Sequence, residues 1–339
     1  MRCVLARGGC RLDGAAVAAR LRAPRCTRLR HAAPCRASAA GLATQEAAPH
    51  VHAVQAYIEF TDCFQVVYYA NYFRFCASAR TAALGPALLR DVLRDSEGRA
   101  TVLSVSGGRL ASPAVLGDLL AVRSHVVSAD ASRLVFRQSV SPAGAPPGAK
   151  PHAACDVTIA FTHARTGELL PLPPALAAAA ASLPAAPPHD AVQPFADNAT
   201  VAETRVTLCG DELGPGGLPS ETDVLRWFER NRTDAIGGGA GLRALQAAGV
   251  LVVVTSVGPL RVDPRAMAAV GRGEVTQVLV RSGVVSRRKG TFFVFKQEAY
   301  AADGGALLAQ GEVTCACVSA ADMKLSPAPP ELLARLAAE

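Results

Sequence analysis

Hydrophobic and polar residues follow one pattern along the chain, and the pattern occurs twice. In residues 70–84 apolar side chains recur at helical spacing, which predicts a helix. A strand pattern precedes this helix at about 52–60. Four further strand patterns, rich in Val, Leu and Phe, follow it near 101–108, 116–128, 132–141 and 154–163. This order is typical of an antiparallel sheet wrapped around a central helix, so we expect an α+β fold.

The second half of the chain repeats this order. A strand is expected at about 200–208, a helix at about 221–235, and strands near 250–257, 273–285, 291–300 and 307–318. Short matches recur in the same order at a period near 155 residues: Arg74 with Arg226, Arg80-Thr81 with Arg232-Thr233, Gly117 with Gly273, Val135–Gln138 with Val294–Gln297, and Asp156–Thr158 with Glu312–Thr314. Two such copies can cover each other's apolar surface, as the subunits of an isologous dimer do. We therefore expect an internal pseudo-dimer, either monomeric or within a homo-oligomer.

The pattern divides the 339 residues into five segments. Residues 1–47 form a leader, 48–170 form copy one and 198–320 form copy two. Between the copies, residues 171–197 combine prolines with an alanine tract, which indicates a semi-rigid, extended tether. Residues 321–339 form a C-terminal tail.

The leader changes the interpretation of the charge. Its first 45 residues hold nine arginines and one acid, Asp13, and so carry +8, whereas the whole chain carries +7. The body of the protein is therefore close to neutral, and the basic pI is no sign of a nucleic-acid partner. An Arg- and Ala-rich, acid-poor segment is typical of an organelle transit peptide. We expect import into the plastid (chloroplast) stroma, with the mitochondrial matrix as the alternative.

Several classes of site are not indicated. The six cysteines outside the leader match no zinc spacing and are interpreted as small buried hydrophobes. We expect no metal and no cofactor. No stretch of about 18 apolar residues is free of charges and turn formers, so no membrane span is expected. Base-stacking aromatics between basic residues are absent, which disfavours nucleic acid.

The candidate chemistry lies in residues 60–75, where a lone carboxylate, Asp62, precedes a short apolar turn and then a helix start near Tyr69–Asn71. The N–H groups and dipole of a helix start favour developing negative charge. A carboxylate facing such a start supplies a base or nucleophile together with an oxyanion hole, the two parts of acyl-transfer chemistry. The alternative is that Asp62 only caps the turn.

This segment resembles the signature of hot-dog-fold thioesterases of the 4-hydroxybenzoyl-CoA thioesterase type. The residues that fit are Thr61-Asp62, Val66-Val67-Tyr68, Ala70-Asn71-Tyr72 and Ala79-Arg80. The resemblance implies two tandem hot-dog units, each an antiparallel sheet wrapped around a central helix. It also implies hydrolysis of an acyl thioester of coenzyme A or acyl carrier protein (ACP).

The resemblance further implies roles for individual residues. The catalytic aspartate falls on Asp62, and Arg80 is a second catalytic candidate because some relatives rely on an arginine in the helix. Backbone N–H groups near Tyr68–Asn71 would polarise the thioester carbonyl. The residues expected to line the substrate site are Gln65, Val67, Tyr68, Tyr69, Asn71 and Tyr72. For Arg80, Asn71 and Tyr72, helix packing or surface exposure is the alternative.

Two departures matter. Many relatives have glycine at Gln65, which bears on the turn geometry and the substrate. In copy two Asp62 maps to Gly214, so we expect one active site per chain and a degenerate second copy. Plastid acyl-ACP thioesterases keep their catalytic residues in the second copy, which is the opposite arrangement.

Three functions are weighed. The first is an acyl thioesterase, with residues 255–300, net +5, as a surface for coenzyme A phosphates or for an acidic ACP, or alternatively as a merely solvated face. The second is a non-catalytic acyl-thioester-binding protein. The third, a dehydratase, is weakest because neither predicted helix contains the histidine that such enzymes usually present.

Overall fold

The computed structural model describes residues 48–337, except residues 63, 147, 197–198, 211–212, 214–217, 288–289 and 304. The predicted transit peptide, residues 1–47, lies outside the described residues, as does Gly214. Copy one contains β1 (His50–Gln55), a 3-10 turn η2 (Ile58–Phe60), α1 (Tyr69–Leu84), α2 (Pro86–Ser96), β2 (Gly98–Leu110), β3 (Leu119–Ala129), β4 (Arg133–Pro142), β5 (Ala153–His163) and β6 (Leu169–Leu170). The helix α3 (Pro174–Ala180) follows.

Copy two has the same order of elements. It contains β7 (Thr200–Thr207), α4 (Glu221–Ala235), α5 (Gly238–Ala247), β8 (Val250–Val262), α6 (Pro264–Gly271), β9 (Gln277–Arg287), β10 (Phe292–Ala301) and β11 (Leu307–Ser319), and α7 (Pro330–Leu336) follows it. The described strands form one 11-stranded sheet in the order β1-β3-β4-β5-β2-β8-β11-β10-β9-β7, with β6 beside β5. Its two halves are mirror-ordered about the β2–β8 pair, so the sequence repeat is also a repeat of topology.

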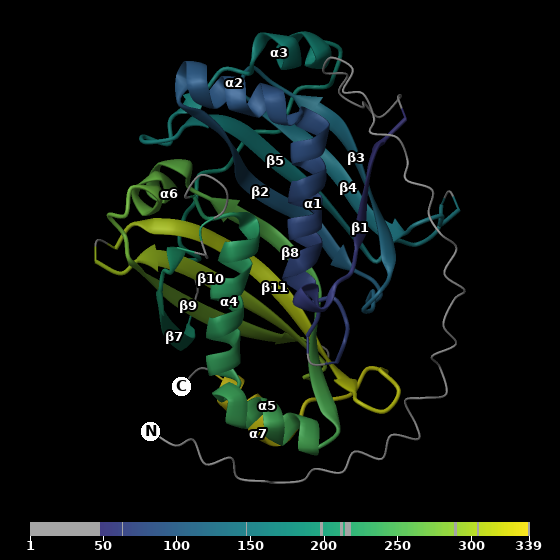
Figure 1. Cartoon of the computed structure of the whole chain (residues 1–339). Coiled ribbons are helices and arrows are strands. Elements are labelled where there is room, and N and C mark those ends of the chain that lie inside the picture. The colour runs from purple at the N-terminus through teal and green to yellow at the C-terminus, as the bar shows by residue number, and fades with distance from the viewer. Residues whose placement is uncertain are drawn as a thin grey trace, which may run out of the picture. The chain divides into compact units, whose positions relative to one another are not determined.

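The two long helices lie on the same face of this sheet (Figure 1). Strand alternation turns large apolar side chains toward them, among them Leu103, Leu134 and Phe136 in copy one and Phe293 and Phe295 in copy two, all almost fully buried. Each such burial stabilises the fold by about 1.5–3 kcal/mol. The core therefore lies between the helices and the inner face of the sheet.

Backbone pairing joins the two copies at the β2–β8 seam. Val105 pairs with Leu260 and Gly108 with Val257, in antiparallel register. A Cβ atom at Gly108 would collide with the backbone oxygen of Val257. Glycine at this position therefore permits the close approach that makes the sheet continuous.

Most predicted elements are confirmed, and the differences have local causes. The predicted strand 52–60 ends early, at Gln55, because the N–H of Ala56 donates to Asp118 O (2.8 Å) and the chain then turns through η2. Gly237, with φ 97°, follows the end of α4. A further helix, α5, which was not predicted, starts at the next residue.

The segment between the copies is not a simple extended tether. It contains α3, whose Leu176 is fully buried, and Pro184 O accepts a hydrogen bond from Ala129 N–H (2.9 Å). The predicted C-terminal tail likewise contains α7, which buries Leu332 and Leu336. Both segments pack on the fold because they carry leucines at helical spacing.

Gly108→Ala tests the seam. We expect it to lower the free energy of unfolding by about 1–3 kcal/mol, because the added methyl group forces the two backbones apart. The measurement is urea denaturation of a protein starting at residue 48. Gly210→Ala is the matched control, since an added Cβ there meets no atom within 4 Å and the change should stay within about 0.5 kcal/mol. Equal stabilities of the two variants would contradict this account of the seam.

Candidate active site

The loop that carries Asp62 is a tight, hydrogen-bonded turn. The N–H of Asp62 donates to Val66 O (2.9 Å), and the N–H of Gln65 donates to Asp62 O (3.0 Å). Thr61 and Val67 close the turn as an antiparallel bridge. The turn therefore holds Asp62 in a fixed place, immediately before α1.

The Asp62 carboxylate caps its own turn. Its Oδ1 accepts hydrogen bonds from the N–H groups of Phe64 (2.8 Å) and Val66 (3.4 Å), and the side chain is exposed. Both bonds use the same oxygen, which leaves Oδ2 to bind a water molecule or a substrate. The capping role anticipated as the alternative is thus real, and it is compatible with a chemical role for the second oxygen.

Gln65 adopts a left-handed backbone conformation, with φ 61°. Glycine enters this region without steric cost, whereas other residues pay about 1–2 kcal/mol. Glutamine at this position therefore keeps the turn conformation but adds backbone strain. The Gln65 side chain is exposed, so it is available at the rim of the site.

The start of α1 has no side-chain cap and no acid in its first turn. Tyr68 N–H donates to Phe60 O (2.9 Å), and Asn71 N–H donates to Tyr68 O (2.9 Å). Among the described residues, no acceptor serves the N–H groups of Tyr69 and Ala70. These two groups, at the positive end of the helix dipole, are the donors that can meet a carbonyl oxygen.

Asn71 and Tyr72 are buried anchors of this helix start. Asn71 Nδ2 donates to Phe60 O (2.9 Å), whereas its Oδ1 has no partner among the described residues. The Tyr72 hydroxyl accepts a hydrogen bond from Ala114 N–H (2.7 Å), and burial raises its pKa to about 12. Both residues fix the loops around Asp62, and the orphaned amide oxygen can accept a hydrogen bond from water or a ligand.

Val67 and Tyr68 lie between the turn and the start of α1. Val67 is buried, and its N–H donates to Ala114 O (2.8 Å). The rings of Tyr68 and Tyr69 meet edge to face with centroids 4.9 Å apart. Burial raises the pKa of Tyr68 well above its usual range.

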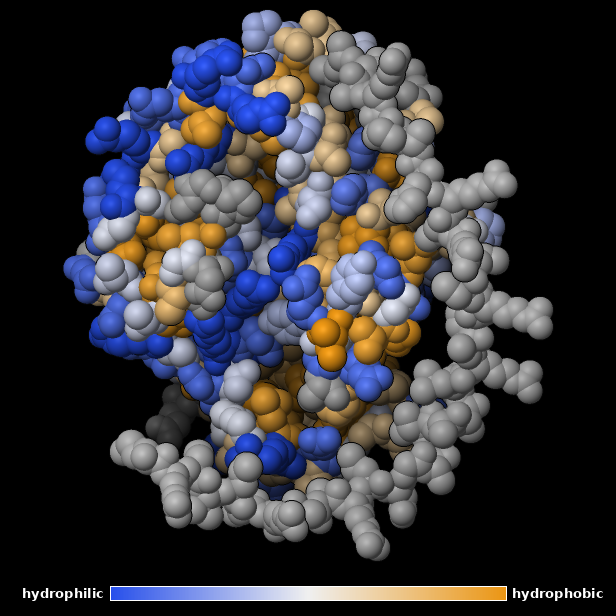
Figure 2. All heavy atoms as spheres, in the orientation of Figure 1, coloured by the Kyte–Doolittle hydropathy of each residue, from blue (hydrophilic) through white to orange (hydrophobic). Residues whose placement is uncertain are grey.

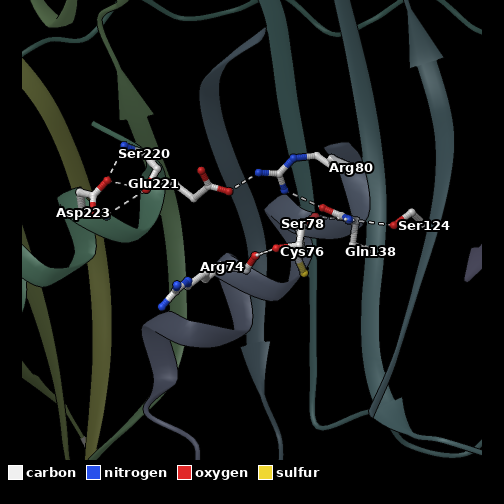
Figure 3. Close-up of polar contacts among 9 residues, drawn as sticks. All are labelled: Arg74, Cys76, Ser78, Arg80, Ser124, Gln138, Ser220, Glu221 and Asp223. Atoms are coloured by element: carbon white, nitrogen blue, oxygen red, sulfur yellow. Dashed lines mark hydrogen bonds and ion pairs between the residues drawn. The ribbon is translucent and has the colours of Figure 1, made fainter. Parts of the chain in front are cut away.

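Arg80, the second catalytic candidate, lies apart from these residues. It is 11 residues beyond Tyr69, about 16 Å along the helix axis. Figure 3 shows its side chain reaching from α1 to Glu221 at the start of α4 on one side and to Gln138 on the other. Both charged side chains are almost fully buried. Because removing one partner of such a pair costs about 3–5 kcal/mol, the geometry gives Arg80 a structural task, and a catalytic one stays a prediction.

The start of α4 differs from that of α1. Ser220 Oγ accepts a hydrogen bond from Asp223 N–H (3.3 Å), and the Asp223 carboxylate accepts one from Ser220 N–H (2.8 Å), a complete capping box (Figure 3). Glu221 adds a second acid. This helix start is already capped and holds two acidic side chains in its first turn, of which Glu221 is paired with Arg80, so it is less suited than the start of α1 to receive an oxyanion.

Exposed apolar side chains surround the Asp62 turn. They come from the chain before it, from the turn itself and from the loop before β3: Tyr57, Ile58, Phe64, Val115 and Leu116. The N–H of Leu116 donates to Gln65 O (2.9 Å), which ties that loop to the turn. Figure 2 shows an orange patch where Figure 1 places the start of α1. We call these five residues the apolar rim.

Two recesses lie elsewhere, beneath the segment that joins the copies. One, of about 440 Å³, is lined by Arg137, His189 and Arg261 among others, and its neighbour measures about 470 Å³. Gln138 faces α1, so strand alternation places Arg137 on the opposite, outer face of the sheet. The recess at Arg137 is therefore separated from Asp62 by the sheet.

Three arginines of the basic segment 255–300 are paired with acids. The pairs are Arg261 with Asp190 (2.8 Å), Arg272 with Glu274 (2.6 Å) and Arg281 with Glu203 (2.9 Å). Two of these acids lie outside the segment, which the local charge count did not include. The geometry therefore favours the solvated-face alternative for these three arginines.

The cysteine interpretation is confirmed at four positions, since Cys76, Cys155, Cys315 and Cys317 are buried. It is wrong for Cys209, which is exposed, and Cys63 lies outside the described residues. In the part of the chain that the structure describes, no helix has the length and apolarity needed to cross a membrane.

Substitutions at Gln65 test the turn. We expect Gln65→Gly to leave the free energy of unfolding unchanged or to raise it by up to about 1 kcal/mol, because it removes the left-handed strain. Gln65→Val should lower it by at least about 1 kcal/mol, since a β-branched residue tolerates positive φ poorly. Both are read from urea denaturation curves, and the exposed side chain ensures that the effect acts through the backbone. A valine variant as stable as the wild type would show that the turn does not hold this conformation.

No protein-family model and no curated protein match the sequence. Among solved structures, a protein assigned as an oleoyl thioesterase from Lactobacillus plantarum matches with a TM-score of 0.59 and 9% identity, over 80% of this chain and 97% of its own. The 12:0-ACP thioesterase from Umbellularia californica matches with a TM-score of 0.57 and 9% identity, over 78% of this chain and 93% of its own. An acyl-ACP thioesterase from Bacteroides thetaiotaomicron matches with a TM-score of 0.52 and 9% identity, over 78% of this chain and 96% of its own. The predicted hot-dog fold is thereby confirmed: the chain has the fold of these thioesterases.

Proposed function

We propose that the chain is an acyl thioesterase of two hot-dog units in tandem, with a single active site at the start of α1. The observation that carries this proposal is the contrast between the two central helices. The α1 start follows the turn that carries the exposed Asp62 carboxylate, has no side-chain cap and no acid in its first turn, and has two N–H groups without an acceptor among the described residues, whereas the α4 start is capped and acidic. Copy two then completes the fold and supports the site.

The chemistry follows from this arrangement. The thioester carbonyl oxygen accepts hydrogen bonds from the N–H groups of Tyr69 and Ala70, which stabilise the negative charge that develops on it. Asp62 either takes a proton from the attacking water or attacks the carbonyl carbon itself. The carbon–sulfur bond breaks, and the products are a free acid and a thiol, with the oxygen and both protons supplied by water.

The apolar rim supports an acyl substrate. Its side chains offer apolar surface directly beside the Asp62 turn, which suits the hydrocarbon part of an acyl group. The structural neighbours are named as oleoyl, 12:0-ACP and acyl-ACP thioesterases. We propose an acyl-CoA or acyl-ACP thioester as the substrate, and the narrower likeness to the 4-hydroxybenzoyl-CoA type belongs to the same proposal.

Asp62→Asn tests the mechanism. Asparagine keeps the Oδ1 acceptor for the Phe64 and Val66 N–H groups, so the turn is retained while the carboxylate is lost. We expect turnover to fall by about 10²–10⁴-fold with stability nearly unchanged. Thiol release is measured across acyl-CoAs and acyl-ACPs of varied chain length.

The matched control for this test is Asp263→Asn. Asp263 caps α6 through the same kind of carboxylate-to-N–H bonds, to Arg265 (2.8 Å) and Ala266 (3.0 Å), and it has no place in the proposed site. Its turnover should equal that of the wild type. Wild-type turnover in the Asp62 variant would refute the mechanism.

One observation favours a second function, a non-catalytic acyl-thioester-binding protein. Asp62 already caps its turn, which is sufficient to explain its presence without chemistry. This alternative predicts saturable binding of acyl thioesters by the folded protein without thiol release from any of them.

We also propose that residues 1–47 direct the protein to the plastid stroma. The supporting observation is the concentration of arginines in a segment nearly free of acids. Residues 1–47 fused to a fluorescent protein should accumulate in plastids, and changing the nine arginines to glutamine should abolish import. Accumulation in mitochondria would support the alternative compartment, and a cytosolic signal would contradict both.

A further inference from the structure

The same hydrogen-bonded arrangement occurs in both copies: an arginine on the long helix donates to a glutamine on the sheet. We call this arrangement the arginine brace. Arg80 and Arg232 are each the twelfth residue of their helix, α1 or α4. Arg80 Nη1 donates to Gln138 Oε1 (2.7 Å) on β4, and Arg232 Nη1 donates to Gln297 Oε1 (2.6 Å) on β10. All four side chains are buried. The duplicated arginines and glutamines of the sequence repeat are therefore one structural device, used twice.

Each arginine also reaches the first residue of the other helix. Arg80 Nη2 donates to Glu221, and Arg232 Nη2 donates to the Tyr69 hydroxyl. Since the start of each helix meets the later part of the other, α1 and α4 run antiparallel. Copy two thus holds the helix start at which the proposed active site lies.

The partners of the two arginines differ in charge. Arg80 finds its counter-charge on the opposite helix, in Glu221. Arg232 finds its counter-charge three residues earlier on its own helix, in Glu229, so its partner on α1 can be the neutral Tyr69. The guanidinium of Arg232 also lies over the Tyr69 ring, 5.4 Å from its centroid.

Tyr69 is held at two points. Its hydroxyl accepts from Arg232 and donates to Leu225 O (3.0 Å). Burial raises the pKa of Tyr69 well above its usual range, so the phenol keeps the proton that it donates. Because the Tyr69 backbone N–H is one of the two groups that lack an acceptor, anchoring this side chain also fixes the direction of that N–H.

A glutamate at this position would bind Arg232 as Glu221 binds Arg80, but it would place a negative charge in the first turn of α1. That charge would oppose negative charge developing on a carbonyl oxygen at the helix start. Tyrosine keeps the anchor and leaves the helix start free of acid.

We propose that Arg232 of copy two and the Tyr69 side chain are positioning residues for the active site of copy one: their buried hydrogen bond fixes the first turn of α1 and keeps it free of negative charge. This inference rests on the proposed thioesterase function. It assigns copy two an indirect part in the site, because Arg232 acts there only through its hydrogen bond to Tyr69.

Three variants test the inference. Tyr69→Phe removes both hydrogen bonds and keeps the ring; Tyr69→Glu keeps a partner for Arg232 and adds charge; Glu221→Gln makes the equivalent change at the start of α4 and is the matched control. We expect kcat to fall about 10–100-fold in both Tyr69 variants, with KM changed less than about 3-fold. The control should keep kcat within about 2-fold, even if its stability falls as much as that of the Tyr69 variants.

Hydrogen exchange provides a readout that does not depend on turnover. In Tyr69→Phe the amides of residues 71–73, which are hydrogen-bonded within the first turn of α1, should exchange faster than in the wild type, whereas in Glu221→Gln they should not. Wild-type kcat in Tyr69→Phe, or unchanged exchange at these amides, would overturn the inference. Loss of thiol release in Asp62→Asn confirms the proposed function separately. If the wild type releases no thiol, the proposed function fails, and the exchange rates alone then decide whether Arg232 anchors the helix start.

Discussion

Two buried guanidinium groups, crossing in opposite directions between α1 and α4, are the interaction on which the rest of the structure depends. A buried arginine is tolerated only where acceptors meet it, and each of these finds acceptors in both copies of the repeat. Copy one could not keep Arg80 buried and paired alone, because its counter-charge, Glu221, lies in copy two, and Arg232 of copy two finds one of its acceptors, Tyr69, in copy one. Together with the backbone pairing of β2 and β8, this requirement makes the two copies one folding unit.

The braces also determine where chemistry is possible. They hold both helix starts in the interior of the protein. The two starts differ in the polar side chains that they carry. Capping and acidic side chains occupy the start of α4, whereas the start of α1 keeps unmatched N–H groups next to a rigid turn and an apolar rim. The two helix starts thus differ through a few residues on an otherwise shared framework.

The periodicity of apolar residues in the sequence was sufficient to predict the two long helices. The predicted helix 221–235 coincides with α4, and 70–84 differs from α1 by one residue, because their apolar spacing is regular over four turns. The Asp62 turn was also predictable, since its residues hydrogen-bond within five positions of one another. The helices α2, α5 and α6 were not predicted, because short helices carry few periodic positions.

The partners of Arg80 and Arg232 could not be predicted, because they lie 141 and 163 residues away in the sequence. Nothing local distinguishes Glu221 from an ordinary acid in the first turn of a helix. The duplicated Arg and Gln positions were the available signal, and they indicated a shared role without showing what that role is. Such contacts depend on how two helices cross, which single-sequence patterns do not encode.

The pairing of Tyr69 in one copy with Glu221 in the other has a consequence for how such a protein can evolve. In a homodimer of identical subunits, one codon specifies both helix starts, so an acid that stabilises one start is also installed at the start where we propose that the carbonyl oxygen binds. A tandem chain has a separate codon for each. Under the proposed function, a tandem chain therefore avoids a conflict between stability and catalysis that two-fold symmetry would enforce.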